Sequence, residues 1–158
     1  MNKQKTTTMD INDIIKHQRN RYPVLLIDKI IDLVPGKRAT GVKCFTYNEW
    51  FFPGHFDDEP NVPGFVQIES LVQTFIMTFL CQDKFSGMKT NFVSIDRIKF
   101  KRKLLPGDVL KIEAVLNSLK FGIAKGSAQS FVDGELACSA EFIVALPAIL
   151  DKFKPKEK

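Results

Sequence analysis

The chain has 158 residues, of which 44% are hydrophobic, so it is long enough to fold as one globular domain with a substantial core. Its net charge of +5 is weak evidence for nucleic-acid binding, because three of these charges fall on the polar ends at residues 1–10 and 151–158. The three cysteines, Cys44, Cys81 and Cys138, are far apart, which argues against a disulfide framework and a metal site and favours a reducing cytoplasm.

We expect neither a signal peptide nor a membrane-spanning helix in this sequence. The first ten residues, MNKQKTTTMD, lack the apolar stretch of a signal peptide. The longest apolar segment, residues 65–81, is short for a membrane span and contains Glu69, whose charge would be costly in lipid. We therefore expect this segment to be a buried helix and the protein to have no membrane span.

The first half of the chain shows a helix, a strand pair and a long loop. Residues 10–17 read as a short helix with Asp10 as its N-cap. Two β-rich segments flank a turn at Pro35-Gly36 and read as strands; they are residues 24–32 and 38–47. The loop at residues 48–63 is long and rich in aromatic and proline residues, and loops of this length are usually functional.

The second half reads as one long helix followed by strands. The helix is expected at residues 64–82, with Pro63 near its first turn. Four segments separated by glycine-containing turns read as strands: residues 92–104, 109–119, 123–132 and 135–146. Asp133-Gly134 is the strongest hairpin signal, and strands joined by tight turns must be antiparallel. The pattern predicts an α+β domain in which a long helix packs on an antiparallel sheet.

No repeat or internal linker divides the chain. We expect one domain at residues 10–148. Residues 1–9 are expected to form a disordered tail and residues 149–158 a basic C-terminal tail.

Glu69 is the one acidic residue of the long helix. At 100° per residue it shares a face with largely apolar residues, namely Phe65, Val72, Gln73 and Ile76. A carboxyl group on such a face is desolvated, which raises its pKa and suits it to act as a proton donor. A structural carboxylate, hydrogen-bonded to a loop amide or to Gln73, explains the pattern equally well.

His55 lies in the long loop between Gly54 and Phe56. Imidazole can accept a proton near neutral pH without prior activation, so His55 is a candidate general base. A single loop histidine is more often structural, because it defines no site geometry by itself. Metal binding is disfavoured, since His17 is the only other histidine.

The long helix begins at Pro63-Gly64. The first N–H groups of a helix have no partner within the helix and carry a partial positive charge. The N–H of Gly64 could therefore polarise a carbonyl oxygen, although every helix has such an end.

Several ordered motifs together resemble one enzyme family. The pattern GHF-x-x-x-P-x-x-PG-x-x-x-x-E-x-x-x-Q, preceded by NEWFF, resembles the active-site signature of 3-hydroxyacyl-[acyl-carrier-protein] dehydratases of the FabZ type. Three further segments resemble the same family in register: RYPVLLID at residues 21–28, IDRIKFKRKLLPGD at 95–108 and VDGELACSAEF at 132–142.

The resemblance implies a hot-dog fold, in which a long central helix is wrapped by an antiparallel β-sheet. It implies dehydration of a (3R)-3-hydroxyacyl chain to a trans-2-enoyl chain in fatty acid biosynthesis, with no cofactor. By the same resemblance, His55 would abstract the C2 proton, Glu69 would protonate the departing hydroxyl, and the Gly64 N–H would hold the thioester carbonyl. The site would lie in a homodimer, with His55 and Glu69 from different subunits, and such dimers often form a trimer of dimers. Glu69, rather than aspartate, favours the FabZ type over the FabA type.

A basic segment lies within the expected third strand, residues 92–104. Strand alternation would place Arg97, Lys99 and Lys101 on one face, with Arg102 next to them. With the family resemblance, this segment is expected to dock an acidic acyl carrier protein; a solvated strand face is the alternative. Nucleic-acid binding through it lacks a recognised motif.

The chain departs from the family pattern at three places. Asp57-Asp58 follow GHF where proline is usual, and Arg19-Asn20 replace the Pro-His that usually precedes RYP. Thr74 and Phe75 stand at helix positions that are usually small. If they faced the acyl site, the enzyme would prefer short or unusual chains; ordinary repacking of the core is the alternative.

Two other functions remain open from the sequence. A hot-dog acyl thioesterase would use a helix carboxylate with water but would lack the GHF histidine. A non-catalytic acyl-binding subunit would not need to retain both His55 and Glu69.

Overall fold

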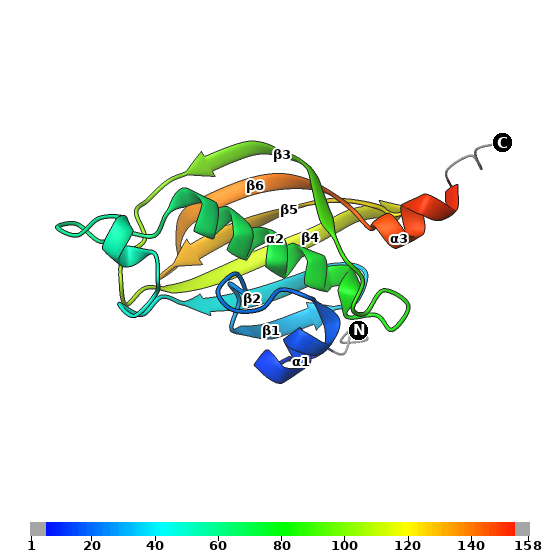
Figure 1. The fold of residues 1–158 in the computed structure, drawn as a ribbon, viewed down its shortest axis with the longest axis horizontal. Coiled ribbons are helices and arrows are strands. Elements are labelled where there is room, and N and C mark those ends of the chain that lie inside the picture. The colour runs from blue at the N-terminus through cyan, green and yellow to red at the C-terminus, as the bar shows by residue number, and fades with distance from the viewer. Residues whose placement is uncertain (1–5, 154–158) are drawn as a thin grey trace.

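The computed structural model describes residues 6–153. A long helix lies across one face of a six-stranded antiparallel sheet (Figure 1). This is the predicted α+β arrangement of a hot-dog domain. In chain order the elements are α1 (Ile11–His17), β1 (Lys29–Val34), β2 (Arg38–Cys44), η1 (Phe52–Gly54), α2 (Gly64–Leu80), β3 (Asn91–Phe100), β4 (Val109–Lys120), β5 (Ile123–Val132), β6 (Glu135–Ala145), α3 (Pro147–Leu150) and η2 (Asp151–Phe153).

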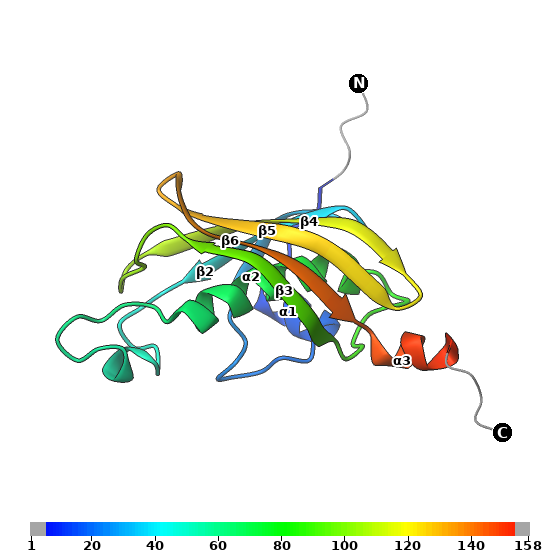
Figure 2. The same ribbon diagram turned by 90° about the horizontal axis from the view of Figure 1, so that it is seen from above.

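The strand order in the sheet is β1-β2-β4-β5-β6-β3. β3 precedes β4 in the chain yet pairs with β6, the last strand, so β1 and β3 form the two edges. Figure 2 shows α1 and α2 on the same side of the sheet, with α3 beyond one end of it. The long loop that holds His55 lies at the opposite end, next to the start of α2 (Figure 1).

The hairpin turns form as the sequence predicts. Asp133 and Gly134 have φ of 51° and 81°, the pair of positive values that a two-residue type I′ turn requires. Phe121-Gly122 repeats this pattern between β4 and β5, with φ of 52° and 81°. These turns align β4, β5 and β6, which form the middle of the sheet behind α2.

The core lies between α2 and the sheet. Phe75 of α2 is fully buried and stacks on Phe142 of β6, with ring centroids 5.8 Å apart. Its ring presses on the backbone of β5 at Gly126, where a Cβ would lie 2.4 Å from Phe75 Cε2 and 2.1 Å from Val115 O. Burial of one such side chain stabilises the fold by about 1.5–3 kcal/mol, and this contact requires glycine on the strand.

Thr74 and Phe75 therefore belong to the core. Thr74 is fully buried, donates to Ser70 O over 3.1 Å, and packs where a Cβ on Gly41 of β2 would meet its hydroxyl at 2.4 Å. Both side chains fill space between helix and sheet, which favours ordinary core packing over a narrowed acyl site.

One predicted strand is wrong over its first half. Residues 24–28 are not a strand. The backbone of residues 24–26 bonds elsewhere: Val24 N and Leu25 N donate to Arg21 O, and Leu26 N donates to Gln73 Oε1, whereas Asp28 N already reaches Val42 O of β2. β1 begins only at Lys29. The remaining strands and α2 differ from prediction by at most a few residues, the largest difference being the end of β3 at Phe100.

The ordered N-terminal part begins earlier than predicted. α1 starts after Asp10, whose side chain caps it by accepting from Asp13 N, as expected. Before it, Met9 pairs with Ile30 and Thr7 N donates to Leu33 O, so residues 7–9 join the edge of the sheet. At the other end, Phe153 packs its ring on Phe121. The rest of the two predicted tails, residues 1–5 and 154–158, lies outside the described residues.

Within residues 6–153, no helix combines the length and the apolar character needed to cross a membrane.

Replacing Gly126 by alanine should destabilise the protein by about 1–3 kcal/mol, because the new methyl group must displace Phe75 or the β4 backbone. Chemical denaturation measures this loss. Gly54→Ala is the matched control, since a Cβ there meets nothing within 4 Å, and its effect should stay within about 0.5 kcal/mol. Equal stability of the two variants would contradict the packing described above.

Candidate active site

Two buried aromatic residues anchor the loop that holds His55. Phe51 and Phe52 are both buried, with ring centroids 4.8 Å apart in an edge-on contact. Phe52 is the first residue of the turn η1, and the His55 N–H donates to Phe52 O over 3.1 Å. The histidine is thus attached to the core through its own backbone.

The imidazole of His55 is fixed by two contacts. Nδ1 lies 2.9 Å from the carbonyl oxygen of Asn61, and the ring stacks on Phe56 with centroids 4.4 Å apart. A carbonyl oxygen can only accept, so Nδ1 carries the hydrogen and Nε2 keeps a lone pair. His55 therefore presents a proton acceptor on the side away from Asn61.

His55 lines an open cavity of about 430 Å³ together with the first turn of α2. Gly64 lies close beneath Phe100, so that a Cβ would come within 3.0 Å of the Phe100 ring. Gln67, one turn later, also lines this cavity; its side chain is buried and its Oε1 has no partner. Helix geometry leaves the Gly64 N–H without a partner in α2, so a donor lies in the same cavity as His55.

Glu69 lines a second, smaller cavity of about 180 Å³. Its Oε1 accepts from Gln73 Nε2 over 2.7 Å and from Asn20 Nδ2 over 3.4 Å. Four apolar residues line much of this cavity, namely Val72, Ile76, Phe92 and Val144, and the polar residues Thr90 and Asn91 complete it. Oε2 remains free of these bonds and can carry a proton toward the cavity.

Gln73 determines how Glu69 is held. Its Oε1 accepts from Leu26 N over 2.7 Å, so its Nε2 must face Val24 O and Glu69, at 2.6 Å and 2.7 Å. The hydrogen bond to Gln73 that the sequence left open is thus present. Burial raises the pKa of Glu69, and the Gln73 hydrogen bond only partly opposes this, so Glu69 stays a candidate proton donor.

Within one chain the two candidate groups are kept apart. Gly64 and Gln67 face the cavity of His55, whereas Glu69 faces the other cavity. Residues two apart on a helix point about 200° away from each other, so Gln67 and Glu69 lie on opposite sides of α2. The structure therefore brings Gly64 to His55 but does not bring Glu69 to either.

The basic segment divides between two surfaces. Lys101, Arg102 and Lys103 line the His55 cavity. Arg97 and Lys99 instead line a depression on the sheet together with Glu141, to which Arg97 is paired at 2.8 Å. A bulge at Arg97, with φ of 52°, interrupts the alternation that the sequence predicts.

Three contributors to these cavities escaped the sequence analysis. The Asn61 carbonyl that orients His55 is a backbone group and leaves no sequence signal. Gln67 could have been found, because it stands one helical turn after Gly64. Asn20 reaches Glu69 across 49 positions of the chain, a contact that only the fold reveals. Asp57, one of the departures from the family pattern, is an exposed residue of the same loop as His55. Among the described residues no cluster of three histidine, cysteine or acidic side chains could hold a metal ion.

The solved structures similar to this chain share its fold at low sequence identity. One is titled the dehydratase heterocomplex ApeI:P from Xenorhabdus doucetiae, with a TM-score of 0.74, 14% identity, and coverage of 88% of this chain and 95% of that chain. Another is a hypothetical thioesterase protein from Streptococcus pneumoniae, with a TM-score of 0.56, 13% identity, and coverage of 74% and 87%. These similarities establish the hot-dog fold alone.

Sequence comparison is more specific. The model of the FabA-like domain matches residues 19–141. A protein of Syntrophomonas wolfei named 3-hydroxyacyl-[acyl-carrier-protein] dehydratase FabZ is 42% identical over 92% of this chain and 99% of its own length. A protein of the same name from Clostridium novyi is 46% identical over 87% of this chain and 94% of its own length. The chain therefore belongs to the FabA-like family and, within it, to the FabZ-type dehydratases.

Proposed function

We propose that the protein dehydrates (3R)-3-hydroxyacyl-[acyl-carrier-protein] to the trans-2-enoyl product in fatty acid biosynthesis. The relatives named FabZ support the reaction and its carrier-bound substrate. The mechanism rests on one observation, which is that the candidate groups lie on two sides of α2. His55 and the Gly64 N–H lie on one side, and the desolvated carboxyl group of Glu69 lies on the other.

The division is resolved if two chains pair through β3. This strand is an edge, hydrogen-bonded on one side to β6, and it exposes apolar residues, among them Phe92, Val93 and Phe100. Phe92 lines the Glu69 cavity and Phe100 lines the His55 cavity. Antiparallel pairing of two β3 strands about a two-fold axis near Asp96 sets Phe92 of each chain against the region of Phe100 in the other. His55 of one subunit would then meet Glu69 of its partner, in a homodimer that could assemble further into a trimer of dimers.

In such a site the reaction needs three groups and no cofactor. The Gly64 N–H donates to the thioester carbonyl and stabilises the negative charge that develops when C2 loses its proton. Nε2 of His55 takes that proton, since Nδ1 is held by Asn61. The C2–H electron pair forms the new double bond to C3 as the C3–O bond breaks.

Glu69 serves the leaving group. Hydroxide leaves poorly, so a protonated carboxyl must donate to the C3 oxygen as it departs, and water is released. Burial favours the protonated form of Glu69, and its Oε1 already accepts from Gln73 and Asn20, which leaves Oε2 to hold the proton.

Carrier docking is proposed at the mouth of the His55 cavity. Lys101, Arg102 and Lys103 line it, whereas Arg97 and Lys99 lie at a different depression on the sheet. Arg102 is paired with Asp108 and Glu135, but no ion pair involves Lys101 within the described part of the chain. Lys101 is therefore the residue best placed to attract an acidic carrier.

Thioester hydrolysis is the second candidate, because a solved structure with this fold is titled a hypothetical thioesterase. It would leave the oriented His55 without a role. A non-catalytic acyl-binding subunit would leave the desolvated Glu69 without a role.

A cytoplasmic location is proposed because the three cysteines are free thiols.

The roles of His55 and Glu69 can be tested by following enoyl absorbance from a 3-hydroxyacyl-carrier substrate, with free thiol measured in parallel. His55→Ala and Glu69→Gln should each lower kcat by at least about a hundredfold, the usual contribution of a positioned acid or base. Phe121→Ala, at an exposed turn, serves as the control. Full activity in either variant, or thiol release matching substrate loss, would sink the proposal.

The pKa shift of Glu69 predicts a pH-dependent stability. Because the folded-state pKa is raised, the folded protein binds more protons than the unfolded chain between the two pKa values, so ionisation of Glu69 lowers stability as pH rises through that interval. Relative to wild type, Glu69→Gln should therefore be more stable above the raised pKa than below the ordinary pKa of glutamate. Denaturation at pH 3.5 and pH 8 measures the difference, and a difference of opposite sign would contradict burial as the dominant cause.

Charge reversal tests docking. Lys101→Glu should raise KM for the carrier-bound substrate about two- to fivefold, because the exposed charge pair between Lys101 and an acidic carrier would be lost. KM for a short thioester analogue should stay unchanged. Lys29→Glu on the opposite edge strand is the matched control, since Lys29 is also exposed. Equal effects of Lys101→Glu on both substrates would count against docking at this surface.

A further inference from the structure

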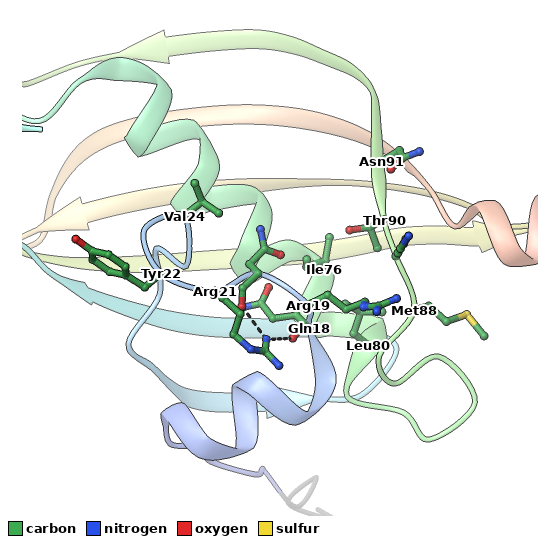
Figure 3. Close-up of a pocket in the computed structure, with 12 residues that line it drawn as sticks. Gln18, Arg19, Arg21, Tyr22, Val24, Ile76, Leu80, Met88, Thr90 and Asn91 are labelled. Atoms are coloured by element: carbon green, nitrogen blue, oxygen red, sulfur yellow. Dashed lines mark hydrogen bonds between the residues drawn. The ribbon is translucent and has the colours of Figure 1, made fainter. Parts of the chain in front are cut away.

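A second cavity adjoins the cavity of Glu69 and is the larger of the two. It has a volume of about 440 Å³ and lies among three segments: the chain after α1, the second half of α2 and the start of β3 (Figure 3). It shares four lining residues with the smaller cavity, which makes the two spaces neighbours: Asn20, Ile76, Thr90 and Asn91.

An apolar path along α2 leads from one cavity into the other. Val72 and Ile76 follow Glu69 at helical spacing in the smaller cavity, and Ile76 and Leu80 line the larger one. At 1.5 Å per residue, Leu80 lies about 16 Å beyond Glu69 along the helix. An acyl chain whose C3 lies at Glu69 would follow this path and bring its far end into the larger cavity.

The far end of the path carries an unsatisfied polar group. Gln18 lines the larger cavity and is 1% exposed, and among residues 6–153 neither its Oε1 nor its Nε2 has a hydrogen-bond partner. A buried polar group left unpaired is destabilising, so a side chain of this kind at a cavity points to a polar ligand.

The backbone of Gln18 is firmly held, so the residue keeps its place at the cavity. Its N–H donates to Ile14 O over 3.0 Å, and its carbonyl accepts from Arg21 Nη1 over 2.8 Å, one of the bonds drawn in Figure 3. Arg21 also donates to the carbonyls of Asn20 and Ile15. Arg21 is thus occupied in fixing the segment and is not available to a ligand.

The charge of the larger cavity is positive. Arg19 and Lys89 line it from the segment after α1 and from the segment before β3, and no lining residue is acidic. Within residues 6–153 neither Arg19 nor Lys89 belongs to a salt bridge, although both side chains are exposed. Arg19 is one of the two positions at which this segment departs from the Pro-His of the family pattern.

We propose that the larger cavity binds a carboxylate at the far end of the acyl chain, so that the enzyme accepts 3-hydroxyacyl thioesters whose last carbon is a carboxyl group. The inference rests on the proposed dehydratase function. Arg19 and Lys89 supply the opposite charge, Gln18 Nε2 supplies a buried donor, and the apolar path holds the methylene groups between the two ends. A methyl end would leave the Gln18 amide unpaired.

The test compares two carrier-bound substrates with the same sixteen-carbon 3-hydroxyacyl chain, which beyond C3 extends over about the 16 Å of this path. One substrate ends in a methyl group and the other in a carboxylate. Wild type is compared with Arg19→Gln/Lys89→Gln and with Gln18→Leu, and Lys29→Gln is the control. For the double variant, kcat/KM for the carboxylate substrate should fall about tenfold, equivalent to about 1.4 kcal/mol, while the value for the methyl substrate stays within about twofold. Gln18→Leu should lower the ratio of kcat/KM for the carboxylate substrate to kcat/KM for the methyl substrate. The decrease of this ratio in the double variant should be smaller at high ionic strength, which screens the charges.

The outcomes separate the two proposals. Turnover of the methyl substrate alone, or an unchanged ratio in the double variant, overturns the carboxylate site and leaves the dehydratase function intact. Failure of wild type to dehydrate either substrate overturns the proposed function and this inference with it. Thermal unfolding of each variant confirms that a changed ratio comes from a folded protein.

Discussion

The packing of α2 against the sheet is the interaction on which the rest of the structure depends. It buries Phe75 against Phe142 and requires bare backbone at Gly126, so the helix can lie close to the sheet in one position only. That position fixes everything the helix carries on its other sides. Gly64 and Gln67 then face the loop of His55, and Glu69 faces the cavity beside β3. The division of the candidate site is therefore a consequence of core packing.

The acid candidate depends on a polar network that also shapes the fold. Gln73 is fully buried, and its amide bonds two backbone groups of the segment 24–26 as well as Glu69. One side chain thereby ends the pairing that would make residues 24–28 a strand and orients the carboxyl group. Because the amide is used on both its oxygen and its nitrogen, Glu69 receives a defined orientation. Desolvation raises the pKa of Glu69, and the bond from Gln73 opposes part of that rise.

Local patterns predicted much of the fold, and the failures have physical causes. The turn at Asp133-Gly134, the cap at Asp10 and the long helix follow from propensities that act within a few residues, and all three are present. The segment 24–28 is β-branched but loses its ladder to Gln73, a distant side chain. Motifs identified His55, Glu69 and Gly64 as candidates. Their distribution over two cavities, and the roles of Asn61 and Asn20, required the three-dimensional arrangement.

The position of Glu69 and His55 on opposite sides of one helix has a consequence for how activity would depend on dilution. On the proposed pairing through β3, a single chain contains the His55 half of one active site and the Glu69 half of another. A complete active site therefore exists only while two chains remain associated. Specific activity would then follow the law of mass action for the dimer. Substitutions at the edge strand, far from any reacting atom, would act as kinetic defects that a higher protein concentration could reverse.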